Sequence, residues 1–427
     1  MMEEFMLEWN PWWNKSYSFD GITRENLKNI LPWIKRKEIV SIVGVRRAGK
    51  TTLLFEIVEH LIKKEKINPK NIFFIKADDD RIKKEKLIDD AIEKYKTLIN
   101  PIGKIYLFID EIQEIDEWQK AVKRIYDLRN DFKIFISGSN TSIIKEELSS
   151  LLAGRYATFE IFPFTFREFL NAKGFNIKDN LTIFQEKNAI KNFLKEYIQY
   201  GAFPEVALEK NENIRKELIG YYFDSIFYRD IIKRKNIRTP AKLENLIKYF
   251  LQNISNLANF TMTGKIFELS TDSVVEYTKA LDDAYLIFSI NLFDYSYKKQ
   301  IINPKKIYCV DTGIRNIIGF KFSEDIGRLY ENIVFLKLRR KLREIYYWTN
   351  KYECDFITKD GNKLEAIQVC YDIEKSKERE LNGLLDALIN FKLNEGTIIT
   401  ENYEIEEKVD GKLIKFIPLW KWLLKIE

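Results

Sequence analysis

Short apolar runs alternate with amphipathic segments over the first 165 residues or so of the chain. The runs are rich in β-branched and aromatic residues and are bounded by glycine or polar residues, which is typical of buried strands. They occupy residues 38–43, 71–75, 105–109, 133–136 and 157–162. Between them, apolar residues recur at helical spacing, as in residues 53–62, 87–95 and 118–129. Repeated strand–helix–strand units of this kind predict a parallel, doubly wound α/β sheet.

The pattern changes twice further along the chain. From about residue 190 to 238 it is helical and rich in aromatic residues, with breaks at Gly201 and Pro204. Residues 239–293 show three helical stretches and a final strand pair, the order of a winged helix-turn-helix. Beyond residue 307 helical and strand patterns alternate as in an α+β domain. We therefore expect four parts, at residues 1–189, 190–238, 239–300 and 301–427.

The turn after the first predicted strand has the form G-x-x-x-x-G-K-[ST], the phosphate-binding loop or Walker A motif. Strand, glycine loop and helix follow one another in the order that phosphate binding requires. Lys50 would reach the β- and γ-phosphates, and the Thr51 hydroxyl can ligate Mg²⁺. We expect the nucleotide to contact Gly44, Val45, Arg46, Arg47, Ala48, Gly49, Lys50, Thr51 and Thr52.

The third predicted strand ends in Asp110-Glu111, at the edge of the sheet where open α/β folds bind ligands. An apolar strand followed by this acidic pair is a Walker B motif. Asp110 would hold Mg²⁺ through water, and Glu111 would polarise the attacking water. A small-molecule kinase needs the first carboxylate but has no use for an adjacent base, so the pair favours a nucleotide hydrolase.

The fourth predicted strand ends in Ser137-Gly138-Ser139-Asn140. A polar side chain there could lie beside the γ-phosphate and sense hydrolysis, and Asn140 or Ser139 is the candidate. The same residue types are also ordinary turn formers.

Arg155 follows Gly154 just before the fifth predicted strand. An arginine there could project from one subunit into a neighbour's nucleotide and stabilise charge on the transferring phosphoryl group. The simpler interpretation is a surface arginine after a helix-capping glycine.

Composition narrows the function classes. At 427 residues and 45% hydrophobic content, the chain is long enough for two to four domains with real cores. A net charge of +6 permits nucleic-acid binding without requiring it. There is no apolar run of about 18 residues, no signal-peptide pattern at the start and no C-x-x-C pair. We therefore expect a cytoplasmic protein without a membrane partner, zinc site or disulfide framework.

These motifs, with Phe162-Pro163-Phe164-Thr165-Phe166-Arg167-Glu168-Phe169, resemble archaeal and bacterial ATPases of the AAA superfamily that carry a C-terminal nuclease-like domain of the PD-(D/E)XK type. Tyr200-Gly201-Ala202-Phe203-Pro204-Glu205 and Gly327-Arg328-Leu329-Tyr330-Glu331-Asn332 also match. The resemblance covers nearly the whole chain. It implies an α/β P-loop ATPase core with a helical lid, a winged helix and a C-terminal α+β restriction-nuclease-like domain. It also favours the finger role for Arg155.

Metal-dependent nucleases of that family need a helix Glu, a strand Asp and a Glu-x-Lys on the next strand. Glu331 and Asp355 fit the first two places. Gln368 and Cys370 stand at the third, where Gln368 could offer an oxygen to a metal but Cys370 cannot supply a cation. Glu365, upstream on the same strand, could partly substitute but is also an ordinary surface acid. This departure favours a degenerate nuclease site that serves as a scaffold or binding surface.

Three functions follow. The first is an ATP hydrolase with Mg²⁺ as cofactor that repositions the winged-helix and nuclease-like parts, with DNA as a candidate partner. Basic residues between 229 and 238, and Lys298-Lys299 and Lys305-Lys306 beside the wing, could serve DNA or simply be solvated. The second is a nucleotide-dependent switch that binds a protein partner with slow turnover, and the third is an ATP-regulated DNA nuclease. ATP is favoured over GTP because no Asn-Lys-x-Asp guanine reader is present, and Arg155 suggests a homo-oligomer.

Overall fold

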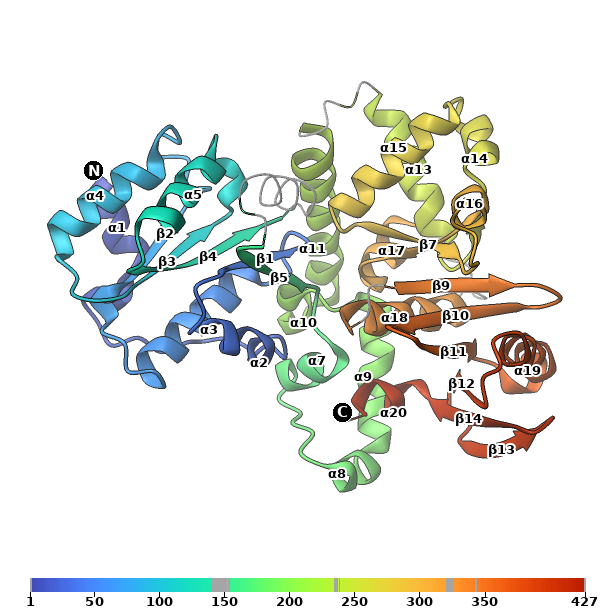
Figure 1. Ribbon diagram of the computed structural model, residues 1–427. Coiled ribbons are helices and arrows are strands. Elements are labelled where there is room, and N and C mark those ends of the chain that lie inside the picture. Colours follow the sequence, from blue (N-terminus) through green and yellow to red (C-terminus); the bar gives the residue numbers. More distant parts are fainter. Residues whose placement is uncertain are drawn as a thin grey trace. The chain divides into compact units, whose positions relative to one another are not determined.

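The computed structural model describes residues 2–139, 152, 154–233, 237, 239–319, 326–341 and 344–425. The chain forms two compact units, Met1–Phe162 and Pro163–Glu427 (Figure 1). Among the described residues, no helix has both the length and the apolar character needed to cross a bilayer.

The N-terminal unit is built on a five-stranded sheet, and all of its strand pairs are parallel. The strands are β1 (Ile39–Gly44), β2 (Ile72–Lys76), β3 (Ile105–Asp110), β4 (Phe132–Gly138) and β5 (Tyr156–Ile161). Their order is β2-β3-β4-β1-β5, so β4 lies between the strands that carry the two phosphate-binding motifs. Every residue of β1, β3 and β4 is buried, as the apolar runs predict. The predicted parallel α/β sheet is confirmed.

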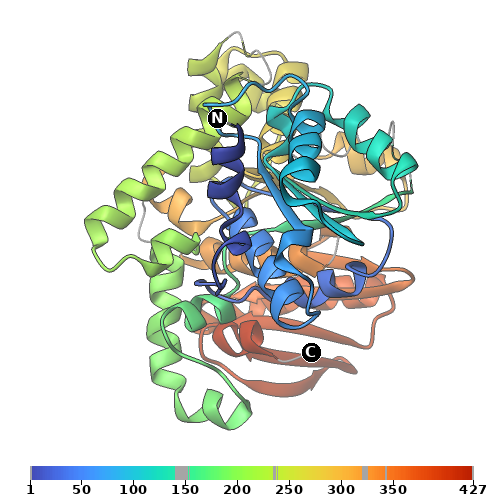
Figure 2. The ribbon, with the colours of Figure 1, turned by 90° about the vertical axis from the view of Figure 1, so that its left-hand side faces the viewer.

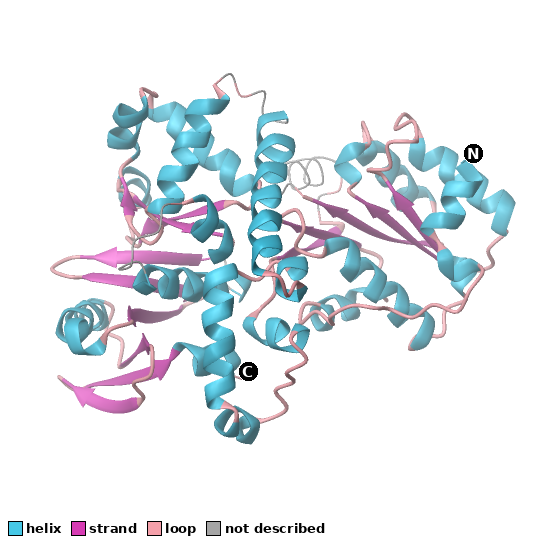
Figure 3. Cartoon of the chain, turned by 180° about the vertical axis from the view of Figure 1, so that it is seen from behind, coloured by secondary structure: helices cyan, strands magenta, loops and turns pink. Residues whose placement is uncertain are grey.

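Helices cover both faces of this sheet. Helix α3 (Lys50–Lys63) lies on one face, and α4 (Leu87–Ile99) and α5 (Trp118–Leu128) lie together on the other (Figures 1 and 3). The sheet edge formed by the carboxyl ends of the strands therefore carries the loops that follow β1, β3 and β4.

The first part of the chain lies along strand β2, the outer strand of the sheet, with α1 (Met2–Trp9) and a 3₁₀ turn at Pro11–Trp13 (Figure 2). The Asn10 amide donates to Phe74 O at 3.0 Å, and Phe74 N donates to Asn10 Oδ1 at 2.7 Å. The buried indoles of Trp12 and Trp13 both donate to Ile72 O, at 3.1 and 2.8 Å. One asparagine side chain thus pairs with the strand edge as a neighbouring strand would. A short helix α2 (Leu27–Ile30) and a 3₁₀ turn (Leu31–Trp33) lead into β1.

The C-terminal unit begins with helices. They are α7 (Phe166–Ala172), α8 (Asn180–Gln185), α9 (Lys187–Tyr200), α10 (Pro204–Leu208), α11 (Glu212–Ser225) and a π-helical turn at Ile226–Ile232. A capping box between Thr165 and Glu168 starts α7. Gly201 ends α9 at a φ of +76°, and a Cβ there would lie 1.8 Å from Asp311 Oδ1. The close approach lets Asp311 accept a hydrogen bond from Ala202 N at 2.7 Å, so only glycine fits this position.

The strands of the C-terminal unit form one nine-stranded sheet, in the order β13-β14-β12-β11-β10-β9-β7-β8-β6. The first part of the chain that contributes to this sheet contains α13 (Pro240–Gln252), β6 (Leu257–Ala258), α14 (Phe260–Phe267), α15 (Thr271–Asp283), β7 (Ile287–Leu292), α16 (Tyr297–Ile302), β8 (Lys305–Cys309) and α17 (Thr312–Ile318). Strand β8 pairs antiparallel with both β6 and β7. The three strands therefore form a small sheet that extends beyond residue 300.

The last part of the unit contains α18 (Ile326–Lys341), β9 (Glu344–Thr349), β10 (Glu353–Asp360), β11 (Lys363–Cys370), α19 (Ile373–Asn390), β12 (Glu395–Thr400), β13 (Ile405–Val409), β14 (Lys412–Pro418) and α20 (Leu419–Leu424). A parallel pairing of β7 with β9 over two residue pairs joins it to the small sheet. Helix α19 packs on β10, β11 and β12 over a core that includes Leu384, Leu388 and Ile398.

Candidate functional site

The phosphate loop leaves β1 at Gly44 and enters α3 at Lys50. Gly44 has a φ of +154°, and a Cβ on it would lie 2.0 Å from Ile161 O on β5. Any side chain at Gly44 would therefore push β5 away from β1. Arg47 and Gly49 adopt positive φ angles of 68° and 92°, which turn the loop back toward the helix.

Lys50 is buried at the start of α3. Its Nζ donates to Gly44 O at 3.2 Å and to Val45 O at 3.3 Å, and lies 3.5 Å from Glu111 Oε1. The predicted loop lysine and the predicted base thus meet across the end of the sheet. These hydrogen bonds of Lys50 are long and weak, so phosphate oxygens could replace the two carbonyl acceptors at a small cost in free energy.

Asp110 joins the ends of β3, β4 and α3. Thr51 Oγ1 donates to Asp110 Oδ2 at 2.7 Å, and Ser137 Oγ of β4 donates to Asp110 Oδ1. Burial, followed by the charge of Glu111, raises the pKa of Asp110 to about 6. A divalent cation beside this carboxylate would favour its ionised form. The Thr51 hydroxyl and Asp110 carboxylate are hard oxygen donors at one point, and they fit Mg²⁺.

Glu111 is buried at the same edge, where Gln113 and Ser137 hold it. Its backbone N–H donates to Ser137 Oγ at 3.0 Å. Gln113 Nε2 donates to the Glu111 carboxylate and also lies 3.5 Å from Ser139 Oγ. Gln113 was not singled out from the sequence, although its place two residues after Glu111 was a usable signal.

Arg24 supports the loop from the segment before β1, and sequence reasoning missed it. Its Nη1 donates to Ala48 O at 2.6 Å, and its Nη2 donates to Phe162 O at 2.7 Å. Its side chain is buried, with the residue 3% exposed. Arg24 therefore ties the phosphate loop to the end of β5. No local pattern marks such a contact, because the partners lie 24 and 138 residues away.

The other two candidates are placed differently. Asn140 lies outside the described residues, whereas Ser139 is buried next to Gln113. Arg155 is 41% exposed and pairs with Asp127 Oδ1 at 2.7 Å. Its carbonyl accepts from Ile39 N at the amino end of β1, about 17 Å along the strand from the phosphate loop. Within one chain Arg155 is therefore at the wrong end of the sheet for the nucleotide, and a finger role requires a second subunit.

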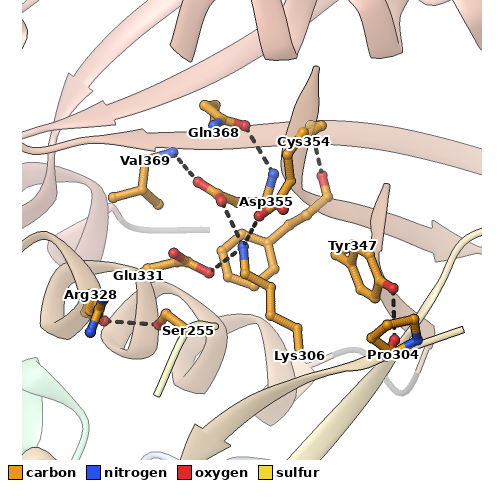
Figure 4. A network of polar contacts seen from close by, with 12 residues as sticks. Ser255, Pro304, Lys306, Arg328, Glu331, Tyr347, Cys354, Asp355, Gln368 and Val369 are labelled. Atoms are coloured by element: carbon orange, nitrogen blue, oxygen red, sulfur yellow. Dashed lines mark hydrogen bonds and ion pairs between the residues drawn. The ribbon is translucent and has the colours of Figure 1, made fainter. Parts of the chain in front are cut away.

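A second polar cluster lies in the C-terminal unit, around the ammonium group of Lys306 on β8 (Figure 4). Lys306 Nζ lies 2.8 Å from Glu331 Oε1, from Glu353 Oε1 and from Asp355 Oδ1. Lys306 is 1% exposed. We call these four residues the carboxylate cluster. Lys306 was expected beside the wing with a surface available to DNA, and its burial corrects that expectation.

The structure brings Glu331 and Asp355 together, as the nuclease-like interpretation expects. Gln368 stands beside them, but its Oε1 accepts from Asp355 N at 2.9 Å and its Nε2 donates to Glu380. Glu365 is half-exposed and pairs with Lys363 at 2.6 Å, as a surface acid does. Gln368, which stands at the third place of the nuclease pattern, thus holds Asp355 in position by accepting a hydrogen bond from the Asp355 backbone N–H.

The strands explain how the cluster forms. The pairing of β10 with β9 shifts register between Cys354 and Ile357, a bulge that re-aims Asp355. Burial raises the pKa of Glu331 to about 8, with the charge of Asp355 adding to the effect. Within the part of the chain that the structure describes, no group of three His, Cys, Asp or Glu residues is arranged to hold a metal ion.

Comparisons with known proteins support the type of domain that carries the first of these sites. Residues 36–170 match the family "AAA domain". Residues 191–324 and 326–422 match two domains of unknown function, DUF8612 and DUF4143. "Uncharacterized protein MJ1544" of Methanocaldococcus jannaschii is 37% identical over 404 residues, 91% of this chain and 88% of that protein. An uncharacterized protein of Haemophilus influenzae is 30% identical over 415 residues, 95% of this chain and 99% of that protein.

The chain belongs to the same family as these two proteins. Its N-terminal unit contains a P-loop nucleotide-binding domain of the AAA type. Among solved structures, the Aeropyrum pernix ORC1 protein in complex with DNA is 11% identical at a TM-score of 0.32, over 70% of this chain and 93% of that one. S. cerevisiae Hsp104 in a casein complex is 14% identical at a TM-score of 0.32, over 65% and 52%. At these TM-scores the two solved structures give no further information about this chain.

Proposed function

We propose that the AAA-type domain binds ATP with Mg²⁺ and hydrolyses it. The observation that carries the proposal is the meeting of Lys50, Thr51, Asp110 and Glu111 at the carboxyl ends of β1 and β3. Loop amides and the start of α3 would hold the phosphates. Bound Mg²⁺ would neutralise charge on the β- and γ-phosphates, with Thr51 and Asp110 holding it.

The contact between Lys50 and Glu111 suggests how binding would prepare hydrolysis. At 3.5 Å the two charges partly neutralise each other in the absence of phosphate. Phosphate oxygens would draw the Lys50 ammonium away from Glu111, which would then be a stronger acceptor for a proton of water. Gln113 keeps the Glu111 carboxylate in place meanwhile. The base would therefore become active only when the loop is filled.

Steady-state ATP hydrolysis by the purified chain tests the proposal. We expect Mg²⁺-dependent turnover that falls by at least 100-fold in Glu111→Gln, since the base contributes at least that much. Glu117→Gln is the matched control, because the Glu117 side chain is exposed and pairs with Lys120 at the surface. Absence of turnover, or equal turnover in both variants, would end this proposal.

We further propose that the nucleotide state moves the C-terminal unit. The order α13, β6, α14, α15, β7, β8 supports a winged helix, and α18 to β12 supports a nuclease-like domain. DNA is the partner that these two parts suggest. Of the basic residues proposed for it, Arg234, Lys235 and Arg238 lie outside the described residues.

One observation favours a protein partner instead. Helix α15, which would enter the major groove in a winged helix, carries Asp272, Glu276, Asp282 and Asp283 against one base, Lys279. Phosphate would repel this helix. The same region exposes apolar side chains, namely Met262, Ile266, Val275, Tyr297, Ile301 and Ile302. A nucleotide-dependent switch for protein binding is therefore the second candidate function.

ATP hydrolysis with and without DNA separates the two candidates. Stimulation by double- or single-stranded DNA that falls steeply with salt would support DNA as the partner. Unchanged turnover with slow ADP release would support the protein-binding switch.

Raising the protein concentration tests whether Arg155 acts between subunits. A specific activity that rises with concentration, and is lost in Arg155→Ala but kept in the exposed control Arg124→Ala, would support action between subunits.

A further inference from the structure

The carboxylate cluster has acids in two places of a metal-dependent nuclease, yet its centre is filled by a side chain. Glu331 comes from α18, and Glu353 and Asp355 come from β10. Lys306 comes from β8, outside the helix and strands that make the nuclease-like pattern. Figure 4 shows its side chain pointing between Glu331 and Asp355.

We propose that the ammonium group of Lys306 is the resident cation of this cluster and that it excludes a divalent metal ion. The nuclease-like resemblance implies Mg²⁺ here, and the residues present do not fit it. The C-terminal domain would then act by binding and not by metal-dependent cleavage. This inference does not depend on ATP hydrolysis in the other unit.

The first argument is the match of donors to acceptors. A lysine ammonium has three N–H donors, and here three carboxylates each place an oxygen 2.8 Å from Nζ. Backbone and side-chain donors hold two of these acids as well. Val369 N donates to Asp355 Oδ2 at 2.9 Å, and Tyr308 OH donates to Glu331 Oε1 at 2.7 Å. A metal ion would have to displace the ammonium and compete with these donors.

The second argument is burial. Glu331 and Asp355 are buried, and together with the half-exposed Glu353 they would repel one another strongly without a cation. Removing one partner of a buried ion pair is also costly. Lys306 at 1% exposure is out of reach of water and of any polyanion. Its charge therefore acts on these acids and not on a ligand at the surface.

The third argument concerns the path of the lysine. Strand β8 is three places from β10 in the sheet order, so a flat sheet would separate them by about 14 Å. The contact of Lys306 with Asp355 requires the sheet to bend after the two-pair junction of β7 and β9. The lysine thus fastens the small sheet of the winged-helix region onto the nuclease-like domain.

A cation could reach the cluster if the lysine were absent. Glu353 is 39% exposed and lines a pocket of about 400 Å³ with Ser255, Asn256 and Ile307. Three oxygens that surround a point at 2.8 Å match Ca²⁺, with ligand distances of about 2.3–2.6 Å, better than Mg²⁺ at about 2.0–2.1 Å. Removing the Lys306 side chain should therefore create a calcium site.

Thermal unfolding of the full chain in EDTA and in Ca²⁺ tests this. For Lys306→Ala we expect a melting temperature about 10 °C below wild type in EDTA, and a recovery of about 5 °C at 100 times the Kd for Ca²⁺. Wild type should not respond beyond the effect of Ca²⁺ on the nucleotide site. Lys306→Ala with Asp355→Asn keeps the nucleotide site but lacks one acid of the cluster, so its response to Ca²⁺ should be no larger than that of wild type.

Lys305→Ala is the matched control, because Lys305 is the neighbouring lysine on β8 and its ammonium group donates to the carbonyls of Gln300 and Ile301. It should melt close to wild type with or without Ca²⁺. A folded Lys306→Ala chain that gains nothing from Ca²⁺ would overturn the proposal.

A second measurement needs no Lys306 variant. The number of Mn²⁺ ions bound per chain, read by electron paramagnetic resonance, should be the same in wild type, Glu353→Gln and Asp355→Asn. Glu353→Gln changes a half-exposed residue and should fold. If wild type binds one Mn²⁺ more than both variants, the cluster is a metal site and the lysine does not exclude the ion.

Discussion

Replacing Arg24 by methionine should loosen the phosphate loop from a distance. The two guanidinium nitrogens donate to Ala48 O at 2.6 Å and to Phe162 O at 2.7 Å, and the residue is 3% exposed. Methionine keeps a flexible apolar side chain of similar length but removes both donors. The two carbonyls would then lose a charged partner in a buried place.

The size of the effect follows from these two bonds. A hydrogen bond to a charged group contributes about 1.5–3 kcal/mol, so the pair sets a range of roughly 3–6 kcal/mol. We expect a loss of about 3 kcal/mol in the free energy of unfolding of the N-terminal unit, because the loop can relax toward water. If about half of this loss falls on the loop, the affinity for ATP drops about tenfold.

Urea unfolding followed by tryptophan fluorescence, and titration with a fluorescent ATP analogue, would measure both quantities. Arg36→Met is the control, since Arg36 is 60% exposed and lies 3.5 Å from Glu38. That variant should stay within about 0.5 kcal/mol of wild type. If Arg24→Met unfolds and binds like Arg36→Met, the loop does not depend on this arginine and the reasoning is wrong.

Three further predictions concern single residues. Gln113→Leu removes the donor that holds Glu111, so kcat for ATP should fall by about tenfold while KM stays unchanged, and an unchanged kcat would refute the positioning role. Gly201→Ala places a Cβ 1.8 Å from Asp311 Oδ1 at a φ of +76°, so it should lower the melting temperature by several degrees, and a melt like that of wild type would contradict the close contact. Burial raises the pKa of Asp311 from 3.8 to about 6, so the native state holds its proton more tightly than the unfolded chain. Its contribution to the free energy of unfolding, roughly 3 kcal/mol, is full below about pH 4 and is lost as pH rises through 6. The unfolding free energy of wild type minus that of Asp311→Asn should therefore fall between these two pH values. A difference that does not change with pH would contradict the raised pKa.

The sequence predicts most of the N-terminal sheet because local pattern and tertiary burial agree there. A strand buried on both faces needs a largely apolar run, and β1, β2, β3 and β4 each have one. The loop and the acidic pair follow two of those runs directly, so their meeting at one sheet edge could be expected.

The C-terminal unit shows where local pattern fails. Strand β13 is an edge strand with largely exposed residues, and Lys415 interrupts the apolar residues of β14, so neither has a long apolar run. Lys305 and Lys306 look alike in the sequence, but the alternation of β8 sends only Lys306 inward. Its acidic partners lie 25, 47 and 49 residues away. Contacts of that kind depend on the finished fold, as those of Arg24 do.

Strand β2 ends the N-terminal sheet, and its outer side would offer free peptide groups to any extended chain nearby. The asparagine at position 10 occupies the N–H and carbonyl of Phe74, and the indoles beside it take the carbonyl of Ile72. Removing residues 1–14 would uncover a strand of Ile, Phe, Phe and Ile to the solvent. A chain that lacks residues 1–14 should therefore pair edge to edge with other copies and precipitate. The N-terminal segment thus protects this protein against aggregation.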